Sequence, residues 1–238
     1  MALKLAGKTV IVTRPRAQSS ELVARLRGIG ARVVLAPAIR IERPRSFASL
    51  DDAIRRSRGY GAAVFTSANA VRPFFSRARR LKTRPELPEM LFAVGRTTAA
   101  ALRKLGERAA MTPKIPTASG LARAMRLGKG TKVLFVKGES AREELPRILR
   151  SRGFRVDAVN AYRTVPDRKG LGRLTPRLLA DADAAFFASP SAVKAFAEEI
   201  GFSRTRKFFE KASAIAIGPT TARELRRFAA RAVIWGAR

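Results

Sequence analysis

Short apolar runs alternate with amphipathic stretches along most of the chain. The stretch 15–28 is predicted as a helix, because Leu22 and Leu26 recur on one face of it. Further helices are predicted at 68–81, 97–105 and 116–125, and strands at 8–13, 32–36, 62–66, 91–94, 132–136, 155–158, 183–188, 213–217 and 232–235. Strands that alternate with helices are typical of parallel sheets covered on both faces. The pattern therefore predicts an α/β protein.

The same pattern occurs twice. The stretch "AVGRTTAAAL" begins at Ala93, and "AIGPTTAREL" begins at Ala216, 123 positions later. The same shift also pairs Val10 with Val133, Leu22 with Leu145, Leu26 with Leu149 and Gly30 with Gly153. A shift of 122 pairs Phe65 with Phe187, Ser67 with Ser189 and Phe74 with Phe196. So many matches at a nearly constant spacing indicate an internal duplication.

Hydroxyl groups, glycines and basic side chains follow the predicted strands in both copies. Parallel sheets bind ligands at the carboxyl ends of their strands, where helix N-termini with free N–H groups converge. Anions such as carboxylates or phosphates suit such positions. The candidate binding residues are Arg14, Ser67, Thr97, Thr98, Lys137, Ser189, Thr220 and Thr221. Each hydroxyl taken alone is better explained as a helix cap, and only the set, repeated in both copies, favours an anion-binding cleft.

Composition narrows the chemistry that these residues could perform. With 238 residues, 46% of them hydrophobic, the chain can form real cores. It contains no cysteine and no histidine, which excludes disulfides, Cys/His zinc sites, a catalytic thiol and an imidazole base. Neither a secretion signal nor a run of about 18 apolar residues is present, so we expect a cytoplasmic protein without a membrane partner.

The formal net charge of +31 favours acidic partners and leaves a nucleic-acid-binding protein as one alternative. The basic residues are spread over nearly every predicted helix, which is more typical of a solvated surface than of a recognition element. We therefore expect no nucleic-acid partner beyond non-specific charge attraction. A two-lobed protein that binds an anionic solute without chemistry is a second alternative.

Seven segments, in this order, resemble the uroporphyrinogen-III synthase family. They are "VIVTRPRAQSSEL" (10–22), "FTSANAV" (65–71), "AVGRTTAAAL" (93–102), "VLFVKGESAREEL" (133–145), "VNAYRTVP" (159–166), "FFASPSAVKAF" (186–196) and "IGPTTAREL" (217–225). The resemblance extends over nearly the whole chain.

The resemblance implies two flavodoxin-like lobes with parallel sheets. The first lobe would be discontinuous, formed by 1–36 and 167–238, and the second would be 44–158. Segments 37–43 and 159–166 would be linkers, paired as a two-stranded ladder. The strand at 8–13 should then share a sheet with 183–188 and 213–217, and should not pair with 62–66.

The resemblance also implies an activity in heme and porphyrin biosynthesis. Members of this family are lyases that close linear hydroxymethylbilane into uroporphyrinogen III, with loss of water and inversion of ring D. They need no metal and no organic cofactor, and a monomer is expected. The family's prominent tyrosine corresponds to Tyr162, a candidate proton donor to the departing hydroxyl, although packing of a linker would also explain it. The family's cleft-facing hydroxyl positions, expected to bind the substrate's carboxylates, correspond to Ser67, Thr98, Ser189, Thr220 and Thr221.

Overall fold

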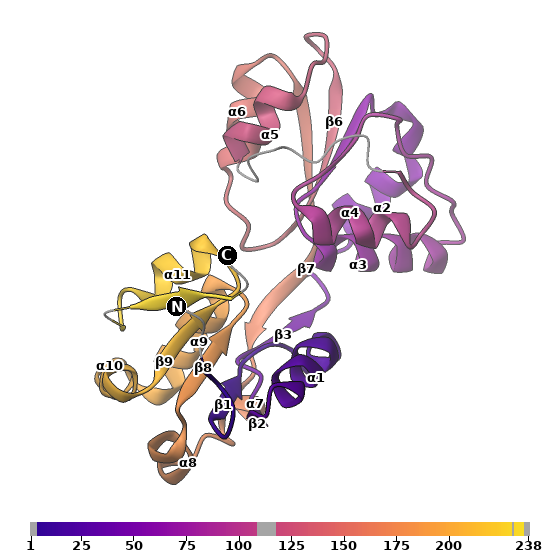
Figure 1. The fold of residues 1–238 in the computed structure, drawn as a ribbon. Helices are drawn as coiled ribbons and strands as arrows, with labels where there is room; N and C mark the ends of the chain where they lie inside the picture. The colour runs from indigo at the N-terminus through magenta and orange to yellow at the C-terminus, as the bar shows by residue number, and fades with distance from the viewer. Residues whose placement is uncertain (1–3, 109–117, 230, 236–238) are drawn as a thin grey trace. The chain divides into compact units, whose positions relative to one another are not determined.

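The computed structural model describes residues 4–108, 118–229 and 231–235, and its chain divides into two compact units. Unit 1 comprises Met1–Arg40 and Val165–Arg238, and unit 2 comprises Ile41–Thr164. Both dividing points fall inside strands, β3 at Ile39–Glu42 and β7 at Arg155–Pro166 (Figure 1). The chain therefore passes between the units twice, each time as extended backbone. The limits expected for lobes and linkers stay a prediction.

Unit 1 is built on a five-stranded parallel sheet in the order β10-β9-β8-β1-β2. Val10 aligns with Ala184 on one side and with Val33 on the other, so β1 lies at the interior of the sheet. This confirms the sheet expected for the N-terminal strand, since β4 lies in the other sheet. In chain order the strands follow the flavodoxin-like arrangement. They are β1 Thr9–Val12, β2 Arg32–Leu35, β8 Ala184–Phe187, β9 Ser213–Ala216 and β10 Ala232–Ile234.

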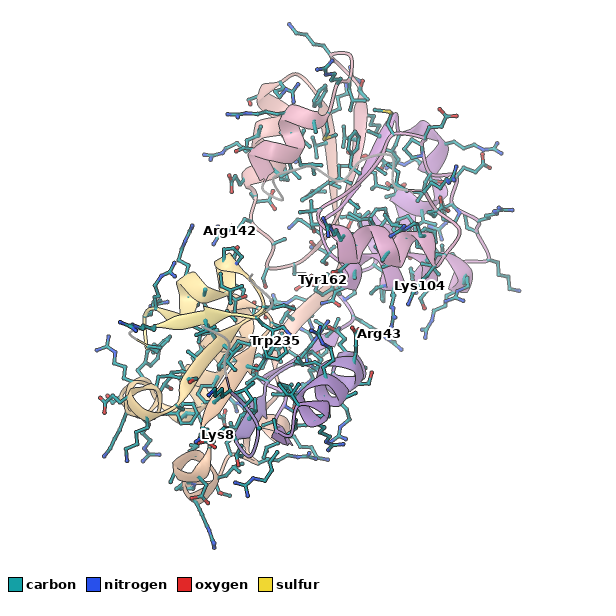
Figure 2. All side chains as sticks on the ribbon, in the orientation of Figure 1. Lys8, Arg43, Lys104, Arg142, Tyr162 and Trp235 are labelled. Atoms are coloured by element: carbon teal, nitrogen blue, oxygen red, sulfur yellow. The ribbon has the colours of Figure 1, made fainter. Side chains whose placement is uncertain are left out.

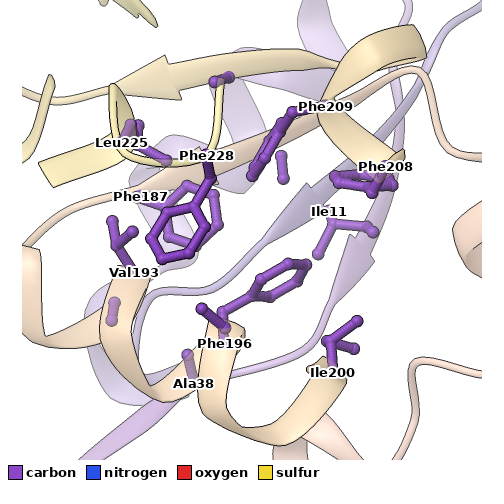
Figure 3. Close-up of a cluster of buried hydrophobic side chains, with 14 of the residues drawn as sticks. Ile11, Ala38, Phe187, Val193, Phe196, Ile200, Phe208, Phe209, Leu225 and Phe228 are labelled. Carbon is purple, nitrogen blue, oxygen red and sulfur yellow. The ribbon is translucent and has the colours of Figure 1, made fainter. Parts of the chain in front are cut away.

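Apolar side chains cover both faces of this sheet, because successive residues of a strand point to opposite sides. Val10 and Val12 pack with Leu22 and Leu26 of α1, whereas Ile11 packs in the larger cluster on the other face. Figure 3 shows that larger cluster, with several phenylalanine rings in contact. The helices are α1 Ser20–Gly28, α7 Arg168–Leu171, α8 Pro176–Asp181, α9 Pro190–Ile200, α10 Phe202–Lys211 and α11 Pro219–Leu225.

The helix predicted at 15–28 is wrong in its first turn. Residues Arg16–Gln18 form a 3₁₀ helix, and α1 begins at Ser20. The buried Ser19 hydroxyl donates hydrogen bonds to the carbonyls of Arg14 (3.1 Å) and Pro15 (2.9 Å). In a continuous α-helix the Pro15 carbonyl would accept from the Ser19 N–H, but here it accepts from the Gln18 N–H at 2.9 Å and from the Ser19 hydroxyl.

Unit 2 contains the second five-stranded sheet, in the order β3-β7-β6-β4-β5. Strand β7 lies between β3 and β6, which confirms the two-stranded ladder. The strand expected at 155–158 continues without a break to Pro166, so ladder and sheet share one strand. The remaining strands are β4 Ala62–Phe65, β5 Leu91–Ala93 and β6 Lys132–Gly138. The helices are α2 Ala48–Arg55, α3 Ala68–Arg80, α4 Arg96–Arg103, α5 Ala118–Ala124 and α6 Glu144–Ser151, with a 3₁₀ turn at Ser57–Gly59.

The helix predicted at 116–125 corresponds to α5, and its first two residues lie outside the described part of the chain. Helices α2, α3 and α4 contribute to the cluster on one face of the unit 2 sheet, and α5 and α6 to the cluster on the other. None of the helices in the described ranges has the length and apolar character needed to span a bilayer.

Equivalent contacts in the two units confirm the duplication. Phe65 and Phe74 meet edge to face with ring centroids 5.4 Å apart, and their counterparts Phe187 and Phe196 do so at 5.3 Å. The same holds for two glycine pairs that close a turn at positive φ. The N–H of Gly7 donates to the Gly30 carbonyl at 2.8 Å, and Gly130 donates to Gly153 at the same distance. These turns favour glycine because side chains are strained in that backbone region.

Candidate functional site

Ser67 after β4, Gly138 at the end of β6 and Tyr162 within β7 lie together in unit 2, and Figure 2 labels Tyr162. The hydroxyl oxygens of Ser67 and Tyr162 lie 3.1 Å apart, and either group could donate the hydrogen bond. Tyr162 is half-buried. A Cβ built on Gly138 would lie 2.7 Å from Cζ of Tyr162, so the ring rests directly on the Gly138 main chain. The phenol is thus held on one side by backbone and at its tip by a hydroxyl.

A change of register aims Tyr162 at Ser67. Lys137 aligns with Asn160, but the next residue of β6, Gly138, aligns with Tyr162, so Ala161 is an extra residue in β7. Such a bulge moves the following side chain to the other face of a strand. Both Ala161 and Tyr162 consequently pack against the cluster that contains α3, whose first residue follows Ser67.

Ser67 and its counterpart Ser189 use their hydroxyls differently although their backbones are alike. Ser67 has φ −156° and ψ 154°, and Ser189 has φ −157° and ψ 155°. The Ser189 hydroxyl accepts a hydrogen bond from the N–H of Ala192 at 3.2 Å and so caps α9. No such side-chain cap is formed by Ser67, whose hydroxyl contacts Tyr162 instead. An N-cap serine normally stabilises its helix, so this position departs from the usual role of a cap.

Lys137 lies at the same strand ends but on the other face of the sheet. Its side chain is 8% exposed, and its Nζ lies 3.0 Å from a carboxylate oxygen of Glu143. Strand alternation places Lys137 with Phe135, on the side covered by α5 and α6, whereas Tyr162 packs on the α3 side. The structure therefore does not bring Lys137 together with the Ser67–Tyr162 pair. Its role in substrate binding stays a prediction.

Asn160, beside Lys137 in the register, has a buried amide oxygen without a hydrogen-bond partner among the described residues. Buried acceptors are nearly always satisfied, so this atom is available to a polar ligand or a water molecule. Sequence reasoning missed Asn160, and it placed Gly138 at the end of its strand without predicting the contact with Tyr162. The register shift that places them here leaves no sign in "VNAYRTVP".

Within the described ranges, no group of three or more acidic side chains lies together as a metal site would require.

The sequence matches a family model and is similar to several known proteins. The family model described as "Uroporphyrinogen-III synthase HemD" matches residues 20–235. The chain belongs to the uroporphyrinogen-III synthase family. The uroporphyrinogen-III synthase of Chlorobaculum parvum is 31% identical over 229 residues, which cover 92% of this chain and 89% of that protein. The porphyrin biosynthesis protein HemD of Ruminiclostridium josui is 30% identical over 98% of this chain, which spans only 47% of the length of that protein.

A crystal structure of a mutant uroporphyrinogen III synthase from Thermus thermophilus has the same fold. It superposes with a TM-score of 0.72 at 23% identity, over 97% of this chain and 94% of that one. An identity this low supports the fold and no more.

In this member of the uroporphyrinogen-III synthase family, the threonines expected to bind substrate fall into two groups. Thr97 and Thr220 are exposed at the first turns of α4 and α11. Their neighbours Thr98 and Thr221 are each 3% exposed. The Thr98 hydroxyl donates to the Val94 carbonyl at 3.0 Å. Thr98 is buried and its hydroxyl is already bonded to the main chain, so it stabilises the fold. Thr97 and Thr220 are exposed and are therefore better placed to contact a ligand.

The remaining predicted position of unit 1, Arg14, follows β1 and is half-buried. Arg14 and Ser189 follow the neighbouring strands β1 and β8, which is the point where the strand order of a flavodoxin-like sheet reverses. Thr13, between β1 and Arg14, is fully buried and donates its hydroxyl hydrogen to the Phe186 carbonyl at 2.8 Å. The binding roles of Arg14 and Ser189 stay predictions.

Proposed function

We propose that this chain cyclises hydroxymethylbilane to uroporphyrinogen III, with loss of water and inversion of ring D. Membership in the uroporphyrinogen-III synthase family supports the reaction class. The observation that carries the assignment of roles is the contact between Ser67 and Tyr162 at the carboxyl edge of the unit 2 sheet. There the half-buried Tyr162 phenol shares a hydrogen bond with the Ser67 hydroxyl.

In the proposed mechanism Tyr162 donates a proton to the hydroxyl of hydroxymethylbilane as it departs. The electron-rich pyrrole expels water and becomes a cationic azafulvene. Ring D attacks that carbon through the α-carbon that already carries its bridge to ring C, and that bridge bond then breaks and re-forms at the other α-carbon, which inverts the ring. Loss of the proton from that carbon restores the pyrrole and balances the proton given by Tyr162. A phenol is a weak acid, with an ordinary pKa of about 10, so it assists departure without protonating the substrate beforehand. Ser67 accepts a hydrogen bond from the phenol or donates one to it, and thereby orients it and stabilises its deprotonated form. The rest of the site is proposed to orient the linear substrate and to exclude water from the reactive intermediate.

The exposed hydroxyls of Thr97 and Thr220, together with Arg14 and Ser189, are proposed to bind the substrate's carboxylates. Free N–H groups and the dipole at helix N-termini favour anions at such positions. The reaction as proposed involves no metal and no organic cofactor. We further propose a monomer that acts in the cytoplasm. All these residues come from one chain, and a chain without cysteine has no disulfide that would need an oxidising compartment.

The test is incubation of the purified protein with enzymatically generated hydroxymethylbilane, followed by separation of the type I and type III isomers. Uncatalysed closure yields the type I isomer, so accumulation of type III measures the activity directly. Type I product alone, at the rate of the protein-free control, would overturn the proposal.

The comparisons lend no support to a nucleic-acid-binding or solute-binding protein. An oligonucleotide titration across a range of salt concentrations tests the nucleic-acid-binding alternative.

A further inference from the structure

Unit 2 contains a cavity of about 330 Å³ that the proposed roles leave unused. It opens beside α3, and its lining includes Ile41, Arg43, Phe47, Arg72, Ser76 and Arg80. A volume in this range is typical of sites for small molecules. Ala161 also lines it, which places the cavity one residue from Tyr162 in β7.

The lining carries positive charge that the protein does not neutralise. Arg72, Ser76 and Arg80 recur every four residues along α3, and so they lie on one side of the helix. Arg43 adds a third cation from the segment after β3. In the described part of the chain, none of these three guanidinium groups is paired with a carboxylate. Like charges grouped at one opening repel each other, and an anionic ligand would remove that repulsion.

The other charged groups at the cavity are already paired, which leaves the three free cations to a ligand. Arg77 makes two hydrogen bonds to Asp51, of 2.7 and 2.6 Å, and its guanidinium lies 4.2 Å from the ring centroid of Phe47. These contacts hold Arg77 and the aromatic wall in place. Glu42 accepts a hydrogen bond from Arg163 at 2.8 Å.

Part of the lining is apolar, since Ile41, Phe47, Pro73 and Ala161 contribute to it. A flat, apolar body would therefore be covered by these side chains while its acidic arms reached the arginines. Guanidinium groups match carboxylates particularly well, because their fork of donors can bind both oxygens.

We infer that this cavity binds one pyrrole ring of the substrate, with its acetate and propionate arms held by Arg72, Arg80 and Arg43. This inference rests on the proposed function and adds a binding site to it. A pyrrole so placed would neighbour Tyr162, because Ala161 contacts the cavity and the Tyr162 hydroxyl lies at Ser67.

The first experiment measures binding of a monocyclic pyrrole that carries one acetate and one propionate arm. We expect saturable binding to the wild type, no binding of the dimethyl ester, and a loss of affinity of about 10-fold or more in R72Q/R80Q. The matched control R103Q/R147Q removes two exposed arginines of unit 2 that do not line the cavity, and it should bind like the wild type. The R72K/R80K variant keeps the charge and should recover only part of the affinity.

Equal losses in R72Q/R80Q and R103Q/R147Q would overturn the inference, because general charge attraction would then explain binding. So would binding of the dimethyl ester as tightly as the diacid. Turnover of hydroxymethylbilane separates this result from the proposed function. If the wild type forms the type III isomer while R72Q/R80Q leaves KM unchanged, the cavity is not a substrate site and the function stands. If the wild type forms no type III isomer, the proposed function fails even where the pyrrole binds.

Discussion

The hydroxyls of Ser67 and Tyr162 lie 3.1 Å apart because one extra residue in β7 turns the tyrosine toward α3. Neither strand alone produces this contact. It depends on the register between β6 and β7, on the missing side chain of Gly138, and on a serine that leaves its helix uncapped. Ser67 therefore serves the site, whereas its counterpart Ser189 stabilises a helix. The two serines can be compared directly by mutation.

Ser67→Ala and Ser189→Ala should have opposite consequences. Ser189→Ala removes the cap of α9 and should lower the free energy of unfolding by about 1 kcal/mol, while loss of its proposed carboxylate contact should raise KM and leave kcat little changed. Ser67→Ala removes no side-chain cap, so its stability should change by less, while kcat falls because Tyr162 loses its partner. Thermal unfolding and steady-state kinetics of both variants decide the matter. Equal stability losses with unchanged kcat in both would show that Ser67 is an ordinary cap.

Gly138→Ala should displace the tyrosine without unfolding the protein. The new methyl group would lie 2.7 Å from Cζ of Tyr162, and the ring tip, as the end of a side chain, is what moves. We expect kcat to fall about as much as in Tyr162→Phe. Gly128→Ala is the matched control, since an added Cβ there meets no heavy atom within 4 Å. Full activity of Gly138→Ala would mean that the position of the phenol is unimportant.

Lowering the pH should lower the free energy of unfolding, partly through protonation of Asp51. The Arg77 guanidinium, which hydrogen-bonds to the Asp51 carboxylate, holds the pKa of Asp51 below its ordinary value. The unfolded chain therefore binds this proton first, so the stabilisation is complete above about pH 4 and disappears as the pH falls through the lower folded pKa. Both side chains keep contact with water, so the effect should be about 1 kcal/mol or less.

Denaturant unfolding between about pH 5 and pH 2 measures this effect. Asp51→Asn should flatten the dependence of stability on pH, while Asp181→Asn, which alters an exposed carboxylate in unit 1, serves as the control. A slope in Asp51→Asn as steep as in the wild type would show that the ion pair with Arg77 contributes nothing to acid sensitivity.

The fold was predictable because its signals are local and occur twice. The buried runs around Ile11 and Phe65 are long enough to identify strands, and the spacing from Phe65 to Phe187 revealed the duplication. The first turn of the helix at 15–28 was not predictable, because it depends on where the Ser19 hydroxyl finds its acceptors.

The candidate site was predictable only in part. The motifs around Ser67 and Ser189 look alike, and nothing local shows that their hydroxyls have different partners. The counterpart of Tyr162 in the other copy, 123 residues earlier, is Ile39. It has no hydroxyl, so Ser189 has no such partner in unit 1 and caps its helix instead. Likewise, the eight-residue spacing of Arg72 and Arg80 is visible in the sequence, but their nearness to Phe47 depends on how the chain folds.

The chemical role of Tyr162 is the central claim, and the products of Tyr162→Phe test it most directly. This substitution keeps the ring on Gly138 and removes only the hydroxyl, so the KM for hydroxymethylbilane should barely change. We expect kcat to fall by about 10- to 100-fold, the lower part of the range for the loss of a general acid. The fraction of type I isomer should rise, because a slower reaction lets the intermediate escape. Wild-type turnover with pure type III product would contradict the account and leave Tyr162 as a packing residue.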